Sequence, residues 1–147
     1  MDKLVLDTNV LIDGTKDYNS AAWQIIDEVF NGTIKLFISY PLQREYRKIL
    51  TREIGDPAYA ERINHLLEIA IFVEVHNIQR LVTDDPEDDK VIATALTAEA
   101  DYLISEDRHL LDLDFQTSVR IIKPKEYLNL KVKDSSWGDF ARLIGIN

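Results

Sequence analysis

The chain has 147 residues, of which 46% are apolar, and both values are typical of one globular domain with its own core. It contains no cysteine, which excludes disulfides, thiolate metal sites and a cysteine nucleophile. Its 26 acidic and 17 basic residues give a formal net charge of −9, which argues against nonspecific, charge-driven binding of nucleic acid. No apolar stretch reaches membrane-spanning length and no leader pattern opens the chain, so we expect a cytoplasmic protein without membrane contact.

Apolar runs of strand length alternate along the chain with amphipathic stretches of helical length. The predicted strands cover residues 3–6, 34–39, 71–75, 102–105 and 119–122. The predicted helices cover residues 21–30, a stretch beginning at Pro41, residues 57–70 and 86–100, and a short turn around Leu110. This alternation predicts an α/β fold with a central parallel sheet of about five strands, covered by helices on both faces.

Acidic residues stand where several of these elements begin or end. Asp7 follows the first predicted strand and Asp107 follows the fourth, at the edge of the sheet where ligands of such folds bind. Asp88 and Asp89 open a predicted helix, whose positive dipole end favours negative charge. A divalent cation would relieve the repulsion among these carboxylates, and oxygen ligands without cysteine favour Mg²⁺ or Mn²⁺. Such ions serve phosphodiester transfer, so the pattern predicts a metal-dependent phosphoesterase.

Each acidic residue also has a structural explanation. An aspartate after a strand is often a turn former or a helix cap, and an acidic run is often a solvated loop or first helical turn. Glu45, with basic neighbours on its helix, would ordinarily form a surface ion pair. It is the joint occurrence of these residues that favours a site.

The ordered motifs resemble those of PIN domains, specifically the prokaryotic proteins classed as toxin components of toxin-antitoxin systems. The sequence Asp-Thr-Asn-Val-Leu-Ile at 7–12 resembles the opening motif of that family, and the stretches 85–90 and 100–111 resemble its second half. The resemblance implies a PIN-like three-layer α/β/α fold and a Mg²⁺- or Mn²⁺-dependent endoribonuclease. It also implies an RNA substrate and a small antitoxin protein as partner. We expect a homodimer.

Carried over by position, the resemblance assigns the catalytic acids to Asp7, Glu45, Asp88 and Asp107. Three of these, Asp7, Asp88 and Asp107, would contact the metal. Supporting polar positions fall on Asn9 and Ser105, and Asp89 is an alternative to Asp88 because register at a helix start is easily displaced by one residue. Glu106 departs from the family pattern, because the family commonly has glycine or a basic residue there.

A basic rim around the acidic site would help an anionic substrate to approach. The candidates are Arg44, Arg47, Lys48 and Arg108, and Tyr40 and Tyr46 are candidates for stacking on unpaired bases, although core packing also explains Tyr46. We expect residues 1–130 to form the PIN domain and residues 131–147 to form an extension with a short docking helix. Two alternative functions remain open: a Mg²⁺-binding phospho-acceptor signalling domain, and a catalytically weak PIN-like module that binds RNA or protein.

Overall fold

The computed structural model of the protein describes residues 1–14, 19–76, 86–114, 117–131, 143 and 145, except for the side chains of residues 86–88. Five strands, all paired in parallel, form one sheet in the order β3-β2-β1-β4-β5. Their bounds are Asp2–Leu6 for β1, Ile34–Ile38 for β2, Ile71–Phe72 for β3, Tyr102–Ile104 for β4 and Arg120–Ile122 for β5. The predicted parallel sheet of about five strands is confirmed.

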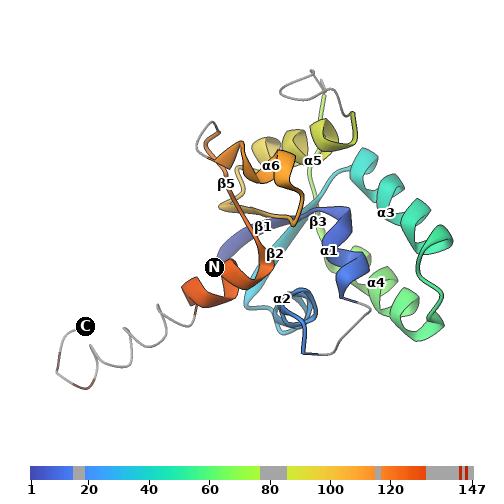
Figure 1. Ribbon diagram of the computed structural model, residues 1–147, viewed down its shortest axis with the longest axis horizontal. Helices are drawn as coiled ribbons and strands as arrows, with labels where there is room; N and C mark the ends of the chain where they lie inside the picture. The colour runs from blue at the N-terminus through green and yellow to red at the C-terminus, as the bar shows by residue number, and fades with distance from the viewer. Residues whose placement is uncertain (15–18, 77–85, 115–116, 132–142, 144, 146–147) are drawn as a thin grey trace.

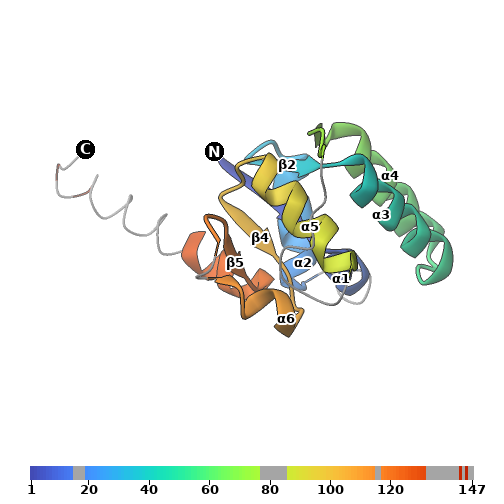
Figure 2. The ribbon, with the colours of Figure 1, turned by 90° about the horizontal axis from the view of Figure 1, so that it is seen from above.

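Helices lie on both sides of this sheet (Figure 1). Their bounds are Thr8–Asp13 for α1, Ala21–Phe30 for α2, Tyr40–Arg52 for α3, Pro57–Ile69 for α4, Pro86–Thr97 for α5 and Arg108–Leu111 for α6. A further helix covers residues 124–131. Figure 1 shows α5 on one side of the strands and α2 on the other, and both Figures 1 and 2 show α3 and α4 side by side at one end of the molecule. The predicted three-layer α/β/α arrangement is therefore confirmed.

The helix boundaries follow local capping chemistry that the sequence already carries. Ser20 caps α2 and Ser39 caps α3, each accepting a hydrogen bond from a backbone N–H of the first turn, and Asp56 does the same for α4. Proline occupies the first turn of α3 and α4, where its missing N–H has no cost. Gly32, with φ of +79°, follows the last residue of α2 and its cap. The predicted bounds of α2 and α4 and the predicted start of α3 agree with these to within one residue.

Two helices were not predicted, and one helix and one strand end several residues earlier than predicted. Helix α5 ends at Thr97, not at residue 100, and the chain turns at Glu99, whose φ is +51°. The helix α1 and the helix over residues 124–131 were not predicted, because each is short and begins two residues after the last residue of a strand. Strand β3 ends at Phe72, not at residue 75, because its neighbour β2 ends at Ile38 and the chain there turns into α3. Both residues of β3 are exposed at the edge of the sheet.

The core lies on both faces of the central strand β1, whose residues Leu4, Val5 and Leu6 are fully buried. This burial on both faces explains the uninterrupted apolar run in the sequence. Among the described residues, no helix combines the length and apolarity needed to cross a bilayer. The helix predicted within the 131–147 extension falls almost wholly outside the described residues.

Candidate active site

Asp7 lies at the carboxyl end of the central strand and is buried, with 6% of its surface exposed. One carboxylate oxygen, Oδ1, accepts the backbone N–H of Thr8 at 2.8 Å, and the other, Oδ2, accepts the Ser105 hydroxyl at 2.7 Å. Burial raises the pKa of Asp7; these hydrogen bonds oppose the increase and the nearby charge of Asp107 adds to it. Asp7 also caps α1, so its structural and predicted functional roles coexist.

Ser105, fully buried, connects Asp7 to Asp107. While its hydroxyl donates to Asp7, its oxygen accepts the backbone N–H of Asp107 at 2.9 Å. Asp107 in turn caps α6 by accepting the N–H of His109 at 2.9 Å. The structure therefore brings Asp7, Ser105 and Asp107 together, as expected from parallel strands β1 and β4 that end at the same edge.

Tyr46, on α3, is buried in the core, which agrees with the packing role considered for it. Its hydroxyl donates a hydrogen bond to the carbonyl of Leu6, the residue before Asp7. Burial raises the pKa of Tyr46 well above its usual value, and the charge of Asp7 raises it further. The phenol therefore stays protonated and holds the end of β1 in place. The sequence patterns did not predict that Tyr46 bonds the end of β1. The available signal was its place on the apolar face of the predicted helix, next to Glu45.

Glu45 projects from α3 toward α5. Its carboxylate lies 4.0 Å from the ammonium of Lys90, and the two side chains are 15% and 27% exposed. The residues that join these two helices were not predicted as part of the site. Ser39 and Thr94, both fully buried, share a hydrogen bond of 2.6 Å between their hydroxyls, and Thr94 also donates to the Lys90 carbonyl. This contact holds the start of α3 against α5.

The amino end of α5 lies at the same edge of the sheet as Asp7. At its other end, the Ala98 carbonyl lies 3.4 Å from the ammonium of Lys3 near the start of β1, so α5 runs antiparallel to the strands. Asp89, near its amino end, is 2% exposed, and its Oδ1 has no hydrogen-bond partner within the described structure. Asp88 is helical, but its side chain lies outside the described residues.

The donor set at this edge suits a divalent cation. Within the described residues, which exclude the Asp88 side chain, no three acidic or histidine side chains already form a metal cluster. A buried carboxylate with a raised pKa, a second carboxylate that repels it and a buried carboxylate oxygen without a partner are nevertheless groups that a cation would stabilise. All are oxygen donors, as Mg²⁺ and Mn²⁺ prefer.

The remaining predicted residues lie at the surface of the molecule or near it. Asn9 is half-buried, and its side-chain oxygen accepts the Glu106 N–H at 3.5 Å, while the Glu106 residue itself is exposed. The four basic candidates Arg44, Arg47, Lys48 and Arg108 are all exposed. The acids, the supporting residues and the basic candidates therefore come from the carboxyl edge of the sheet, from α1, α3 and α6, and from the amino end of α5.

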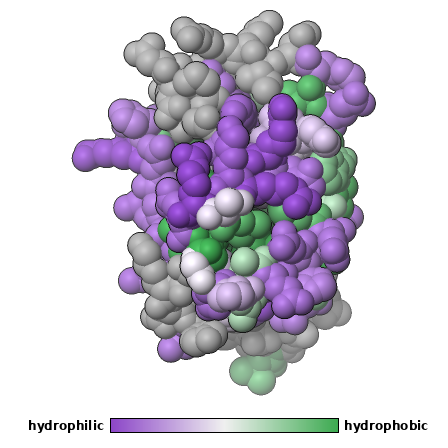
Figure 3. Space-filling view, turned by 90° about the vertical axis from the view of Figure 1, so that its right-hand side faces the viewer, coloured by the Kyte–Doolittle hydropathy of each residue, from purple (hydrophilic) through white to green (hydrophobic). Residues whose placement is uncertain are grey.

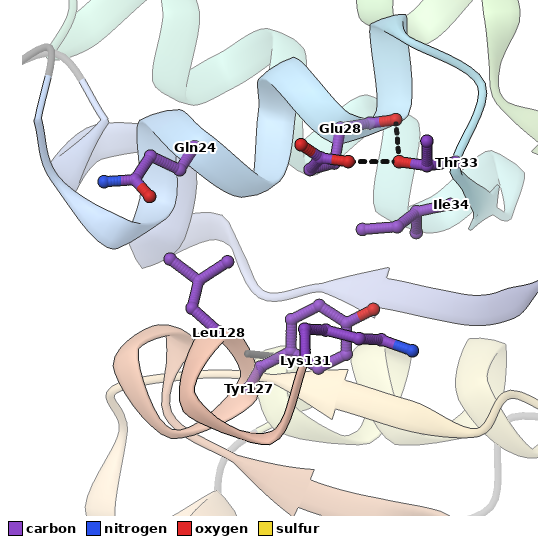
Figure 4. Close-up of a pocket in the computed structure, with 7 residues that line it drawn as sticks. All are labelled: Gln24, Glu28, Thr33, Ile34, Tyr127, Leu128 and Lys131. Carbon is purple, nitrogen blue, oxygen red and sulfur yellow. Dashed lines mark hydrogen bonds between the residues drawn. The ribbon is translucent and has the colours of Figure 1, made fainter. Parts of the chain in front are cut away.

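A hollow of about 490 Å³ lies elsewhere, between α2 and the helix over residues 124–131 (Figure 4). It is lined by Ile34, the first residue of β2, and by Tyr127 and Lys131. Glu28 and Thr33, joined by a hydrogen bond in Figure 4, line it as well. Because Ile34 opens its strand, this hollow belongs to the amino edge of the sheet, opposite the acids.

Comparison with known proteins agrees with this architecture. One chain of the crystal structure of VapBC2 from Rickettsia felis, bound to a DNA fragment from its promoter, superposes with a TM-score of 0.57 and 10% identity, covering 81% of this chain and 96% of that one. The structure of PAE2754 from Pyrobaculum aerophilum superposes with a TM-score of 0.56 and 16% identity, covering 89% of this chain and 90% of that one. At these identities the superpositions show the fold alone.

A comparison with curated proteins finds no match. The family model described as PIN domain matches residues 3–109, which include every described acid of the candidate site. PIN domains are generally nucleases that use divalent metal ions. With most of its length matched by that model and its sheet and helices arranged as above, the chain belongs to the PIN domain family.

Proposed function

We propose that this protein is a metal-dependent endoribonuclease and the toxin component of a toxin-antitoxin system. The observation that carries the proposal is the buried link from Asp7 through Ser105 to Asp107, which holds two carboxylates at one edge of the sheet despite their mutual repulsion. Such an arrangement lowers the stability of the fold and is therefore typical of a functional site. Family membership and the resemblance of the motifs favour RNA as the substrate.

In this proposal the residues of the chain have distinct tasks. Asp7, Asp107 and Asp88, with Asp89 as the alternative to Asp88, hold Mg²⁺ or Mn²⁺. Glu45 orients the hydrolytic water and Lys90 limits the negative charge beside it. Ser105 and Thr8 fix the rotamer of Asp7 by donating to its two oxygens. When bound, the metal would polarise the phosphate and neutralise the charge that develops during hydrolysis, which leaves a 5′-phosphate and a 3′-hydroxyl.

Three helix-capping aspartates allow a matched test. Asp7→Asn and Asp107→Asn remove a charge at the site, whereas Asp56→Asn makes the same change at the cap of α4, away from the sheet edge. Asparagine caps helices as well as aspartate does, so capping is preserved in all three variants. Each protein is incubated with end-labelled RNA and Mn²⁺, and the products are separated on a denaturing gel.

We expect wild type and Asp56→Asn to cleave, and the two site variants to lose at least ~100-fold in rate, the scale of a lost electrostatic contact to a transition state. Equal cleavage by Asp7→Asn would refute the site. RNA binding without cleavage by the wild type would favour the binding module, and covalent labelling by a small phosphodonor would favour the phospho-acceptor domain. Parallel Asp88→Asn and Asp89→Asn variants decide which of these two residues belongs to the site.

The partners are tested separately. The similarity of fold to a chain of VapBC2 supports a search for a small antitoxin in the neighbouring reading frame. Residues 1–130 are proposed as the PIN domain and residues 131–147 as an extension that docks on the domain, on a second copy or on the antitoxin. Truncation after Lys131, followed by size-exclusion chromatography with and without the partner, distinguishes these cases, because loss of dimer or of partner binding would identify the extension as the interface.

A further inference from the structure

We infer that the surface at the start of α3 binds unpaired bases of the RNA substrate, through an aromatic groove formed by Tyr40 and Phe72. This inference rests on the proposed ribonuclease function and names the part of the substrate that the protein would recognise. Tyr40 is 65% exposed and Phe72 is 49% exposed, and these are the two exposed aromatic rings that line one hollow of about 660 Å³.

The position of the groove follows from strand pairing. Ile38, the last residue of β2, pairs with Phe72, and two residues later the chain reaches Tyr40 at the start of α3. Both rings therefore come from the carboxyl ends of neighbouring strands, at the edge that carries Asp7. Strand β1 is the next strand beyond β2, so at ~4.8 Å per strand the groove lies about 10 Å along this edge from Asp7, a distance that a short stretch of RNA spans.

The chemistry of the groove suits a nucleobase. The guanidinium of Arg44 lies 5.6 Å from the centroid of the Tyr40 ring, so a planar cation and an aromatic face stand beside each other. Unpaired bases stack on such surfaces, whereas bases in a duplex are already stacked on one another. Pro41 and Val73 complete an apolar wall beside the rings.

A second hollow continues from the first across Phe72, which lines both. It measures about 500 Å³ and is also lined by Gln43, Asn64 and Arg47. Side-chain amides both donate and accept hydrogen bonds, so they can read the polar edge of a base whose face is stacked nearby. A protein partner fits this surface less well than a base does. Protein interfaces commonly bury ~800 Å² on each side and have an apolar centre, whereas here a small stacking surface lies next to amides. Figure 3 shows the side of the molecule on which α3 and α4 lie, where apolar surface runs between polar surface.

Charge indicates what the groove recognises. Glu74 lines the first hollow with Arg44, and Glu68 lines the second with Arg47, so each hollow contains one acid and one base. Attraction for phosphates is therefore small, and most of the affinity must come from the bases. Binding through bases depends only weakly on salt, in contrast to binding through the phosphate backbone.

The test measures RNA binding by the full chain carrying Asp7→Asn, which would not cut the probe. The probes are a fluorescein-labelled oligouridine and a labelled abasic strand of equal length. Binding of each probe is measured by fluorescence anisotropy at two salt concentrations. Tyr40→Leu and Phe72→Leu remove each ring and keep an apolar side chain at an exposed position. Phe30→Leu is the matched control: Phe30 is exposed and lies 4.9 Å from the Arg62 guanidinium, but it ends α2 near the opposite end of β2.

We expect each groove variant to bind oligouridine about 5- to 150-fold more weakly than the Phe30→Leu control, the range for loss of one stacked base. The abasic strand should bind weakly to all the proteins and should not distinguish the variants. Equal affinities of groove and control variants for oligouridine would overturn the inference, even if the wild type cleaves RNA. If the groove variants bind RNA as the control does but elute at a different volume in size-exclusion chromatography, the groove would be a protein contact, and the inference would also be overturned. If binding depends on the bases but the wild type does not cleave RNA, the groove would be supported and the proposed ribonuclease function would be refuted.

Discussion

Ser105→Ala is the most informative change at the candidate site, because it removes one oxygen that serves two partners. The buried Asp7 carboxylate loses the hydroxyl that donates to it at 2.7 Å, and the Asp107 N–H loses its acceptor at 2.9 Å. A hydrogen bond to a charged group contributes ~1.5–3 kcal/mol and an ordinary one ~1 kcal/mol. We therefore expect the free energy of unfolding at neutral pH to fall by about 2.5–4 kcal/mol.

The loss should depend on pH, and its sign follows from the pKa of Asp7. Burial raises this pKa above the unfolded value of 3.8, so the folded state binds the proton more tightly than the unfolded state does. Stability from this group is full below pH 3.8 and is lost as pH rises through the folded pKa. Removing a donor to the ionised form raises the folded pKa further and extends that loss to higher pH. The difference between wild type and variant should therefore grow with pH and then level off.

The assay is urea unfolding at several pH values between 4 and 8 in the presence of a chelator, so that no metal contributes. Ser20→Ala is the control, because Ser20 caps α2 by accepting the N–H of Trp23 at 3.1 Å and bonds no acidic group among the described residues. It should lose ~1 kcal/mol at every pH. A Ser105→Ala loss that is equally independent of pH would refute the link between Ser105 and the ionised Asp7.

Three further predictions concern the fold and the metal. Gly14→Ala would place a Cβ against the hydroxyl of the buried Tyr59, so urea unfolding should show a loss of ~1–3 kcal/mol in the free energy of unfolding. The control Gly55→Ala places its Cβ in open space and should lose nothing. Similar losses in both variants would contradict the packing argument. Arg62→Met removes a guanidinium that lies 4.1 Å from the Trp23 centroid and also forms an ion pair with Asp27, so the same assay should show a loss of ~1–2 kcal/mol. An unchanged midpoint would show that these two contacts together contribute nothing. Adding Mn²⁺ at a hundred times its dissociation constant should stabilise the wild type by ~2.7 kcal/mol, seen as a rise in Tm that a chelator reverses, and no rise would contradict the proposed metal binding.

Much of the fold was predictable because its determinants are local. The strands of the sheet are short apolar runs. The helices α2, α3 and α4 begin directly after Ser20, Ser39 and Asp56, which cap them through their own side chains. The short helix α1 was not predictable in this way, since its six residues carry too little periodicity to separate a helix from a turn after Asp7.

The candidate site was predictable only in part. The sequence by itself determined that Asp7 and Asp107 would meet, because parallel strands that each end in an acid deliver both to the same edge. Only the tertiary structure decided how that pair is held. Ser105 donates across 98 residues of sequence and Tyr46 reaches the Leu6 carbonyl from α3, and Lys90 approaches Glu45 from another helix. The spatial order of β3, β2 and β1 also places Phe72 and Tyr40 at the same edge of the sheet as Asp7. The physical reason is that caps and apolar periodicity act between close neighbours in the chain, whereas charge repulsion and burial act through space, between residues that only the packed fold brings together.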